Sequence, residues 1–258
     1  MTLPKLDQDT LRETLERAGI EAGDGLLVHS ALQLLGRPEG GLPMYWEAIR
    51  SLIGDAGTIA VPTFTFAFAR GQDFDPTSTP SEGMGAFSEF IRQQPKALRT
   101  PHPMQSLAVL GRHAADLAGR DTPSAFDDGS AFDCMLELDF KLLLLGADIQ
   151  AASLVHYSEQ RAAVPYRYWK EFAGRVKSAS GWEHKTYRMF VRDLDLDPQL
   201  TLQAIQDTLE AGGQWHSRRL NFGKVAACRM RDFRVAADAL LAADAWVLVA
   251  NRPEGVDR

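Results

Sequence analysis

The sequence is poor in cysteine and shows no metal-binding pattern. Its 258 residues include two cysteines, Cys134 and Cys228, which are far apart and form no CxxC pair. Disulfide frameworks need more cysteines, and zinc sites need Cys or His at short, regular spacings. We therefore predict two reduced, buried thiols and no metal cofactor.

Positive charge is also scarce. The chain has 28 Lys and Arg residues against 34 Asp and Glu residues, a net charge of -6. Nonspecific binding of nucleic acid needs a basic face, so a nucleic-acid partner is disfavoured. A few basic side chains and backbone N–H groups can still hold a small anion.

Long apolar runs are missing as well. No segment approaches the roughly 18 residues that a membrane-spanning helix needs. The start of the chain, Lys5 to Asp9, is polar and acidic, unlike a signal peptide. The sequence therefore predicts a cytoplasmic protein without a membrane partner, and it leaves the oligomeric state open.

Three common enzyme motifs are absent. The chain has neither the GxxxxGK[ST] phosphate loop nor the GxSxG nucleophile elbow. Gly83-Met84-Gly85 precedes a predicted helix but lacks the third glycine of a dinucleotide fingerprint. These absences disfavour P-loop enzymes, α/β-hydrolases and dinucleotide-dependent enzymes.

Strands and helices are predicted to alternate over the first two thirds of the chain. Short apolar runs at 26–29, 58–61, 106–110 and 141–145 favour buried strands, and helical spacing favours helices near 9–19, 42–53, 86–93 and 112–118, with another after Asp148. Residues 172–192 favour an antiparallel pair, and 246–249 a last strand. We predict an α/β fold with three α/β/α layers, a largely parallel sheet and a smaller, mixed or antiparallel C-terminal part. Residues 1–258 are expected to form one domain, with a candidate subdomain boundary near 165–172.

Polar residues follow several of the predicted strands, where sheets of this class bind ligands. They are His29 and Ser30, Thr63, and the helix after Leu145, and the segment from Arg99 to Ser106, which precedes its strand, belongs with them. His29 could equally be a buried core residue, and His102, which lies between two prolines, could simply belong to a turn.

The helix after Leu145 carries Ser153, His156 and Glu159 at intervals of three residues. Residues so spaced share one helix face. A carboxylate one turn from an imidazole can accept its N–H, fix its tautomer and raise its basicity, as a general base requires. The spacing alone is equally typical of an unimportant hydrogen bond on a helix surface.

Taken in order, these segments resemble the aminoglycoside 3-N-acetyltransferase family, which is unrelated to the common GNAT acetyltransferases. The resemblance covers about residues 10–176. Its motifs are Leu27-Val28-His29-Ser30-Ala31-Leu32 with Gly36, Gly57-Thr58 through Val61-Pro62-Thr63-Phe64, Met84-Gly85, Arg99-Thr100-Pro101-His102-Pro103 with Ser106, Gly129-Ser130, and Leu143-Leu144-Leu145-Gly146 leading to His156 and Glu159. Two positions depart from it, because Ala31 replaces a serine and Ala131 replaces a proline.

The resemblance implies transfer of an acetyl or short acyl group from acyl-CoA directly to an amine, in a ternary complex. By similarity His156 is the general base and Glu159 orients it. Thr63 or a neighbouring backbone N–H is the candidate donor to the oxyanion. The residues that would line the CoA groove are Ser30, Ala31, Thr63, Phe64, Thr100 and Ser106.

The acceptor amine can be read in two ways. Asp128, with Asp127 and Asp133, could form an acidic pocket for a polycationic aminoglycoside. A nucleotide-linked amino sugar would instead need cations for its diphosphate and aromatic rings for its base. The candidates for that role are Tyr166, Arg167 and Trp169, with Tyr168 and Lys170. We favour the nucleotide-linked sugar. An inactive module that only binds CoA is the alternative of another class.

Overall fold

A seven-stranded sheet forms the centre of the structure, a computed structural model in which residues 3–253 are described. The order is β10 (His216–Leu220), β11 (Gly223–Arg229), β7 (Lys141–Leu145), β2 (Gly25–Ser30), β4 (Thr58–Pro62), β6 (Leu107–Gly111) and β5 (Leu98–Arg99). The central strands β7, β2 and β4 are parallel to one another, whereas β6 and β11 pair antiparallel with their neighbours. Because β5 and β10 pair antiparallel with β6 and β11, five of the seven strands point the same way, and the predicted, largely parallel sheet is confirmed.

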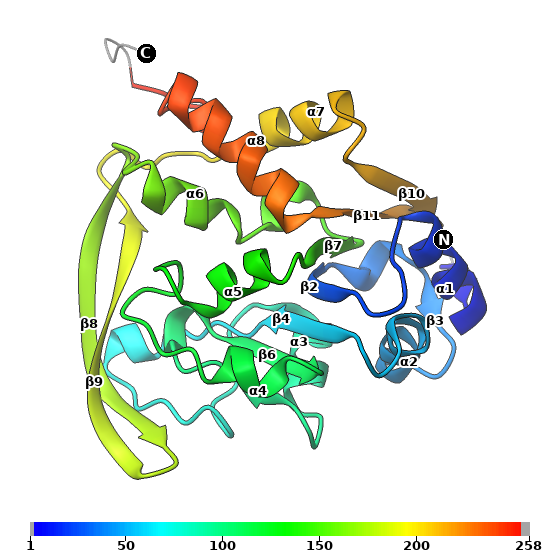
Figure 1. The fold of residues 1–258 in the computed structure, drawn as a ribbon, viewed down its shortest axis with the longest axis horizontal. Coiled ribbons are helices and arrows are strands. Elements are labelled where there is room, and N and C mark those ends of the chain that lie inside the picture. The colour runs from blue at the N-terminus through cyan, green and yellow to red at the C-terminus, as the bar shows by residue number, and fades with distance from the viewer. Residues whose placement is uncertain (1–2, 254–258) are drawn as a thin grey trace.

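Helices cover both faces of this sheet, as the three-layer prediction expects (Figure 1). Strand β7 shows why its sequence is continuously apolar. Leu142 and Leu144 belong to one core, and Leu143 and Leu145 to the other, because successive side chains of a strand point to opposite faces. One core contains α1 (Gln8–Arg17), α2 (Leu42–Ile53) and α3 (Gly85–Arg92), and the other contains α4 (Ala114–Ala118), α5 (Ala131–Glu137), α6 (Val155–Arg161), α7 (Gln203–Ala211) and α8 (Met230–Ala243).

A long antiparallel hairpin forms an arm along one side of the molecule (Figure 1). Its strands are β8 (Arg167–Ser178) and β9 (Gly181–Arg192). The pair was expected over 172–192, so the prediction is confirmed and the hairpin starts five residues earlier. Part of the hairpin packs on a small separate core, formed by Phe68, Phe74, Met104, Val176 and Tyr187. Phe190, near the other end of the hairpin, packs against one of the main cores.

The strand expected at 246–249 is wrong. These residues lie in turns, and Val249 makes only an isolated bridge to Leu200. Trp246 and Leu248 are buried in the core beneath α7 and α8. Their hydrophobicity therefore reflects packing against helices and not membership of the sheet.

The helix expected between Asp148 and Arg161 is interrupted. A single 3-10 turn, Ile149–Ala151, precedes α6, which begins at Val155. Ser153 therefore lies before the helix, and only His156 and Glu159 share its face.

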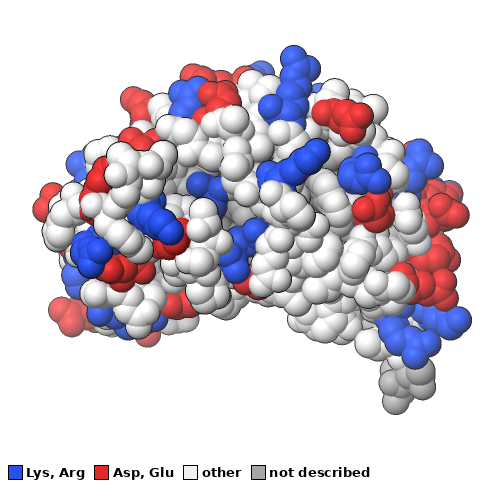
Figure 2. All heavy atoms as spheres, turned by 90° about the horizontal axis from the view of Figure 1, so that it is seen from below, with Lys and Arg blue, Asp and Glu red and all other residues white. Residues whose placement is uncertain are grey.

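Several short elements were not expected. Besides α5, β5 and β10, they include the parallel pair β1 (Lys5–Leu6) and β3 (Arg37–Pro38) and the 3-10 turns Leu32–Leu34, Phe68–Arg70 and Pro103–Gln105. Within residues 3–253, no helix combines the length and the apolar character needed to cross a bilayer. Figure 2 shows basic and acidic side chains interspersed over one face of the molecule.

Candidate active site

His156 and Glu159 form a close pair on α6. His156 is the second residue of this helix, and its Nδ1 lies 2.6 Å from Oε2 of Glu159 one turn later. The Glu159 side chain is fully buried, whereas that of His156 is 30% exposed. When Nδ1–H donates to the carboxylate, Nε2 is the ring nitrogen that carries the lone pair.

Glu159 keeps its negative charge in spite of this burial. Burial alone would raise its pKa, but the hydrogen bond from His156 and the charge of Arg167 lower the pKa below its ordinary value. Nε of Arg167 lies 3.0 Å from Oε2 of Glu159. A carboxylate that stays ionised stabilises the imidazolium that forms when His156 accepts a proton.

His156 lies between two cavities, and both include His156, Phe64 and Leu200 in their walls. The hairpin pocket, of about 570 Å³, is bounded by β8, β9 and the segments 64–66 and 194–200. The loop pocket, of about 490 Å³, is bounded by residues 29–33, 83–85 and 150–153. Two cavities that meet at one imidazole can bring two substrates together at its Nε2.

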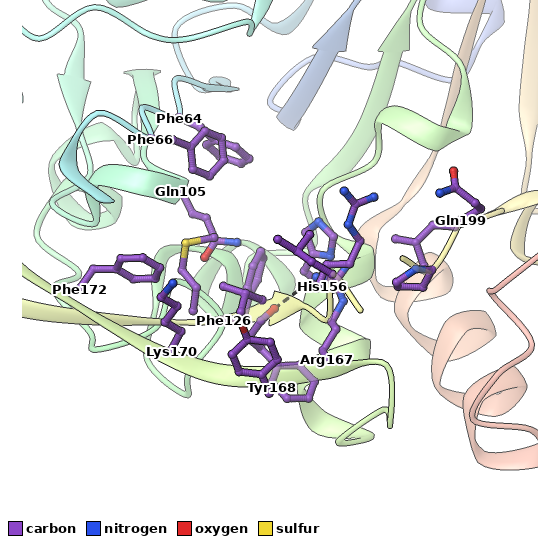
Figure 3. A pocket seen from close by; sticks show the side chains of 17 residues that line it. Phe64, Phe66, Gln105, Phe126, His156, Arg167, Tyr168, Lys170, Phe172 and Gln199 are labelled. Atoms are coloured by element: carbon purple, nitrogen blue, oxygen red, sulfur yellow. Dashed lines mark hydrogen bonds between the residues drawn. The ribbon is translucent and has the colours of Figure 1, made fainter. Parts of the chain in front are cut away.

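The hairpin pocket combines cations with aromatic rings (Figure 3). Its charged lining residues are Arg167, Lys170 and Arg192, and no Asp or Glu of the described chain is among its walls. Lys170 projects into it from the hairpin beside Tyr168 and Phe172. The remaining rings are those of Phe64, Phe66, Phe126 and Phe190. Such a pocket favours a flat or anionic group over a cation.

The loop pocket lies where β2, β4 and β7 end, and its walls within the described chain carry neither acidic nor Lys or Arg side chains. His29, at the end of β2, accepts or donates a hydrogen bond of 3.3 Å between its Nε2 and Oγ of Ser153. Burial, together with the charge of the nearby His156, lowers the pKa of His29 to about 3. His29 is therefore neutral at ordinary pH.

The loop that carries Phe64 and Phe66 is held by one carboxylate. Glu82 accepts hydrogen bonds from the backbone N–H groups of Phe66 and Ala67 and from the hydroxyl of Thr65. It also forms an ion pair of 2.8 Å with Arg70. These contacts fix both rings at the wall of the hairpin pocket.

Of the residues predicted for the CoA groove, Ser30, Ala31 and Phe64 line the loop pocket. Thr63, Thr100 and Ser106 do not line either pocket, and all three are buried. Their hydroxyls are engaged with one another, with the backbone or with Arg99. In the structure these three hydroxyls are thus occupied by contacts within the protein and lie outside the pocket walls.

The residues predicted to bind the acceptor need larger corrections. The ring of Tyr166 is fully buried against Trp246, so it cannot stack on a ligand. Trp169 lies on the surface, between Phe190 and the guanidinium of Arg188. Neither ring lines the hairpin pocket.

The two predicted charged contacts are also engaged elsewhere. Asp128 is highly exposed, is ion-paired with Arg161 and does not line either pocket. Arg167 does line the hairpin pocket, but its guanidinium is committed to Glu159 and to the carbonyl of Phe190. It therefore supports the His156–Glu159 pair.

The prediction missed Phe172, Phe190 and Arg192 as pocket residues. Alternation along the strand could have identified part of this set. Tyr168, Lys170 and Phe172 are two residues apart and share one side of β8, whereas Trp169 lies on the other side. The contribution of β9 could not be read without the pairing register.

No metal site emerges in the part of the chain that the structure describes, since no three His, Cys, Asp or Glu side chains there could surround an ion. The fold and the site together define a three-layer α/β protein with a His–Glu pair between two cavities. The family model for aminoglycoside 3-N-acetyltransferase matches residues 27–242, most of the chain. The chain belongs to the aminoglycoside 3-N-acetyltransferase family.

Individual relatives agree with this assignment. Aminoglycoside N(3)-acetyltransferase III from a Salmonella species is 32% identical over 180 residues, which are 63% of this chain and 63% of that protein. The matched region is thus less than two thirds of that relative's length. Aminoglycoside N(3)-acetyltransferase VIII from Streptomyces fradiae is 30% identical over 203 residues, 70% of this chain and 68% of that protein.

Solved structures share the fold. The binary complex of AAC-IIIb with CoASH covers 96% of this chain and 100% of its own, with a TM-score of 0.81 and 22% identity. The YokD protein from Bacillus subtilis covers 95% of this chain and 96% of its own, with a TM-score of 0.81 and 20% identity. At these identities the likeness establishes the architecture, and the chemistry must be argued from this chain's own residues.

Proposed function

We propose that the protein is an acetyl-CoA-dependent N-acetyltransferase in which His156 is the general base. One observation carries the proposal: His156, oriented by a buried and ionised Glu159, lies where two separate cavities meet. Direct transfer between two bound substrates requires such a junction, because donor and acceptor must approach one base from different sides.

The loop pocket suits the pantetheine arm of the donor. Its walls are uncharged, and they offer the hydroxyl of Ser30 together with backbone groups of Gly83 to Gly85. A neutral, narrow chain of amides and a thioester matches such walls better than a charged ligand would. The relative solved with CoASH supports CoA as the carrier. The acyl group is taken to be acetyl, as in the names of the relatives.

The reaction then follows from the geometry of the pair. The neutral amine attacks the thioester carbonyl carbon, an N–C bond forms, and the carbonyl electron pair moves to oxygen. Nε2 of His156 accepts the proton that the nitrogen loses, while Glu159 stabilises the resulting imidazolium. Collapse of the intermediate breaks the C–S bond, and the imidazolium returns the proton to the departing sulfur.

The acceptor is an amine, and two classes remain in competition. The family and the names of its relatives support an aminoglycoside most directly. The hairpin pocket, which has Lys170 and Arg192 but no acidic wall residue, favours our reading of a nucleotide-linked amino sugar. Its rings at Tyr168 and Phe172 would stack on the base. Lys170 would meet the diphosphate, together with Arg192, which also forms an ion pair of 3.6 Å with Asp197.

One assay tests both levels of the proposal. Release of free thiol from acetyl-CoA is followed with a dTDP-linked amino sugar and with a deoxystreptamine aminoglycoside. We expect turnover of at least one acceptor, with the higher kcat/KM for the nucleotide sugar. Preference for the antibiotic would reverse the choice of acceptor. Binding of CoASH without turnover of any amine would instead favour an inactive CoA-binding module.

A further inference from the structure

The backbone amide of Phe64 stands out in an otherwise fully bonded loop. The amides of Thr63, Thr65, Phe66 and Ala67 each donate a hydrogen bond to a described residue. The amide of Phe64 donates to none of the residues in 3–253, although Phe64 is only 9% exposed. Most amides of folded proteins find an acceptor within the protein, so this one is available to a group bound in the adjoining pockets.

The position of Phe64 fits a role in the reaction. Phe64 is the second residue after β4 and, with His156 and Leu200, belongs to the walls of both pockets. On the proposed function, the thioester carbonyl must lie where the pockets meet, within reach of His156. A free N–H at this junction can meet the oxygen that becomes negative as the amine attacks.

The other end of the same peptide unit is held unusually firmly. The carbonyl of Thr63, which belongs to the Thr63–Phe64 peptide, accepts hydrogen bonds from Oγ of Ser106, at 2.8 Å, and from the Arg99 guanidinium. Nε of Arg99 also donates to the hydroxyls of Thr63 and Ser106. The amide of Thr63 and the carbonyl of Phe64 are bonded too, to Ser106 and Glu82. The peptide therefore cannot rotate without breaking several contacts.

The Arg99 side chain supplies charge as well as position. Arg99 is buried and forms no ion pair with a carboxylate in the described chain, and its guanidinium lies 4.8 Å from the centre of the Phe74 ring. A cation that donates to a peptide carbonyl polarises the peptide unit and strengthens the N–H at its other end. The charge of Arg99 therefore makes the N–H of the Thr63–Phe64 peptide a stronger hydrogen-bond donor.

We propose that the backbone N–H of Phe64 is an oxyanion donor, and that Arg99 and Ser106 are positioning residues that hold and polarise the Thr63–Phe64 peptide for it. The inference rests on the proposed acyl transfer. It replaces the hydroxyl of Thr63 with the amide that follows it, because that hydroxyl is already bonded to Ser106.

An amide-to-ester replacement at Phe64, made by introducing the corresponding α-hydroxy acid, removes the N–H and leaves the side chain unchanged. We expect kcat to fall about 100-fold or more, as for the loss of one oxyanion donor. The KM for acetyl-CoA and the affinity for CoASH, which has no carbonyl to bind, should change little. The same replacement at Thr65, whose amide bonds Pro103, is the matched control and should retain kcat.

Ser106→Ala tests the positioning role separately. It removes one of the two donors to the Thr63 carbonyl and should lower kcat about 3- to 10-fold without raising the KM for acetyl-CoA. Ser124→Ala, at an equally buried serine bonded to Gln160, is the control that should leave kcat unchanged.

Wild-type kcat in the Phe64 ester, or an equal loss in the Thr65 ester, would overturn the inference while leaving the transferase intact. A wild-type protein that acetylates no amine would instead refute the proposed function, and the inference with it.

Discussion

The two cavities that meet at His156 are built in different ways. The loop pocket is formed where β2, β4 and β7 end in the middle of the sheet, and it is uncharged. The hairpin pocket owes much of its wall to β8 and β9, which lie outside that sheet and contribute cations and rings. On the proposed function, the pocket at the end of the sheet would hold acetyl-CoA, which is the same donor for every acceptor, and the hairpin pocket would select the acceptor.

The largest effect is expected for His156→Ala, which should abolish most acyl transfer whichever acceptor occupies the hairpin pocket. Loss of the general base should lower kcat about 10²- to 10⁴-fold for every acceptor. Calorimetric titration should still show CoASH binding, because the loop pocket keeps its other walls. His184→Ala, on the exposed face of β9, is the control. Normal kcat in the His156 variant would remove the base assignment.

Glu159→Gln should have a smaller effect that is still common to all acceptors. The amide can accept the hydrogen bond from His156 but cannot stabilise the imidazolium by charge. A charged hydrogen bond contributes about 1.5–3 kcal/mol, so kcat should fall about 10- to 100-fold. Kinetics over a pH series would check that the loss resides in kcat. If CoASH binding disappears instead, Glu159 has only a structural role.

Lys170→Glu combined with Arg192→Glu should affect one pocket only. The kcat/KM for a dTDP-linked amino sugar should fall about 10-fold or more, because two charged contacts to the acceptor are lost. The KM for acetyl-CoA should remain as in the wild type. Lys96→Glu combined with Arg112→Glu, at an exposed lysine and an exposed arginine outside both pocket walls, controls for the same change in net charge. An equal loss of kcat/KM with both acceptor classes would show that the hairpin pocket does not select the acceptor.

The dependence of the free energy of unfolding on pH allows the two regions to be compared without any substrate. Burial lowers the pKa of His29, in the loop pocket, to about 3 and that of His102, beneath the hairpin, to about 4. Both are neutral in the folded state, while their unfolded counterparts take up protons near pH 6.5. The free energy of unfolding should therefore be highest above pH 6.5 and fall towards pH 4, by up to roughly 1.4 kcal/mol per pH unit for each histidine.

His29→Gln should reduce that slope by about one histidine's share, as measured by urea denaturation at several pH values. The exposed His184 supplies the control, since its replacement by alanine should leave the slope as it is. An unchanged slope in the His29 variant would mean that the pKa of this imidazole is the same in the folded and the unfolded protein.

The sequence predicted helices and strands correctly where the spacing of apolar and polar residues matches the period of the element. The five leucine and lysine residues of 141–145 predicted β7, and the spacing of His156 and Glu159 predicted the pair on α6. The same reasoning failed at 246–249, because an apolar run is buried equally well by helices as by a sheet. It failed again at Tyr166, whose ring is as buried as any core residue.

The sequence by itself determined the alternation of strands and helices, the His156–Glu159 pair and the polar residues after each strand, since these depend on spacing along the chain. Only the tertiary structure decided which of those polar groups face a cavity. It turned Thr63, Thr100 and Ser106 inward, paired Arg167 with Glu159, and gave the Phe64 amide no acceptor among residues 3–253. The physical reason is that burial and hydrogen-bond satisfaction depend on contacts between distant segments, such as the 36 positions between Thr63 and Arg99.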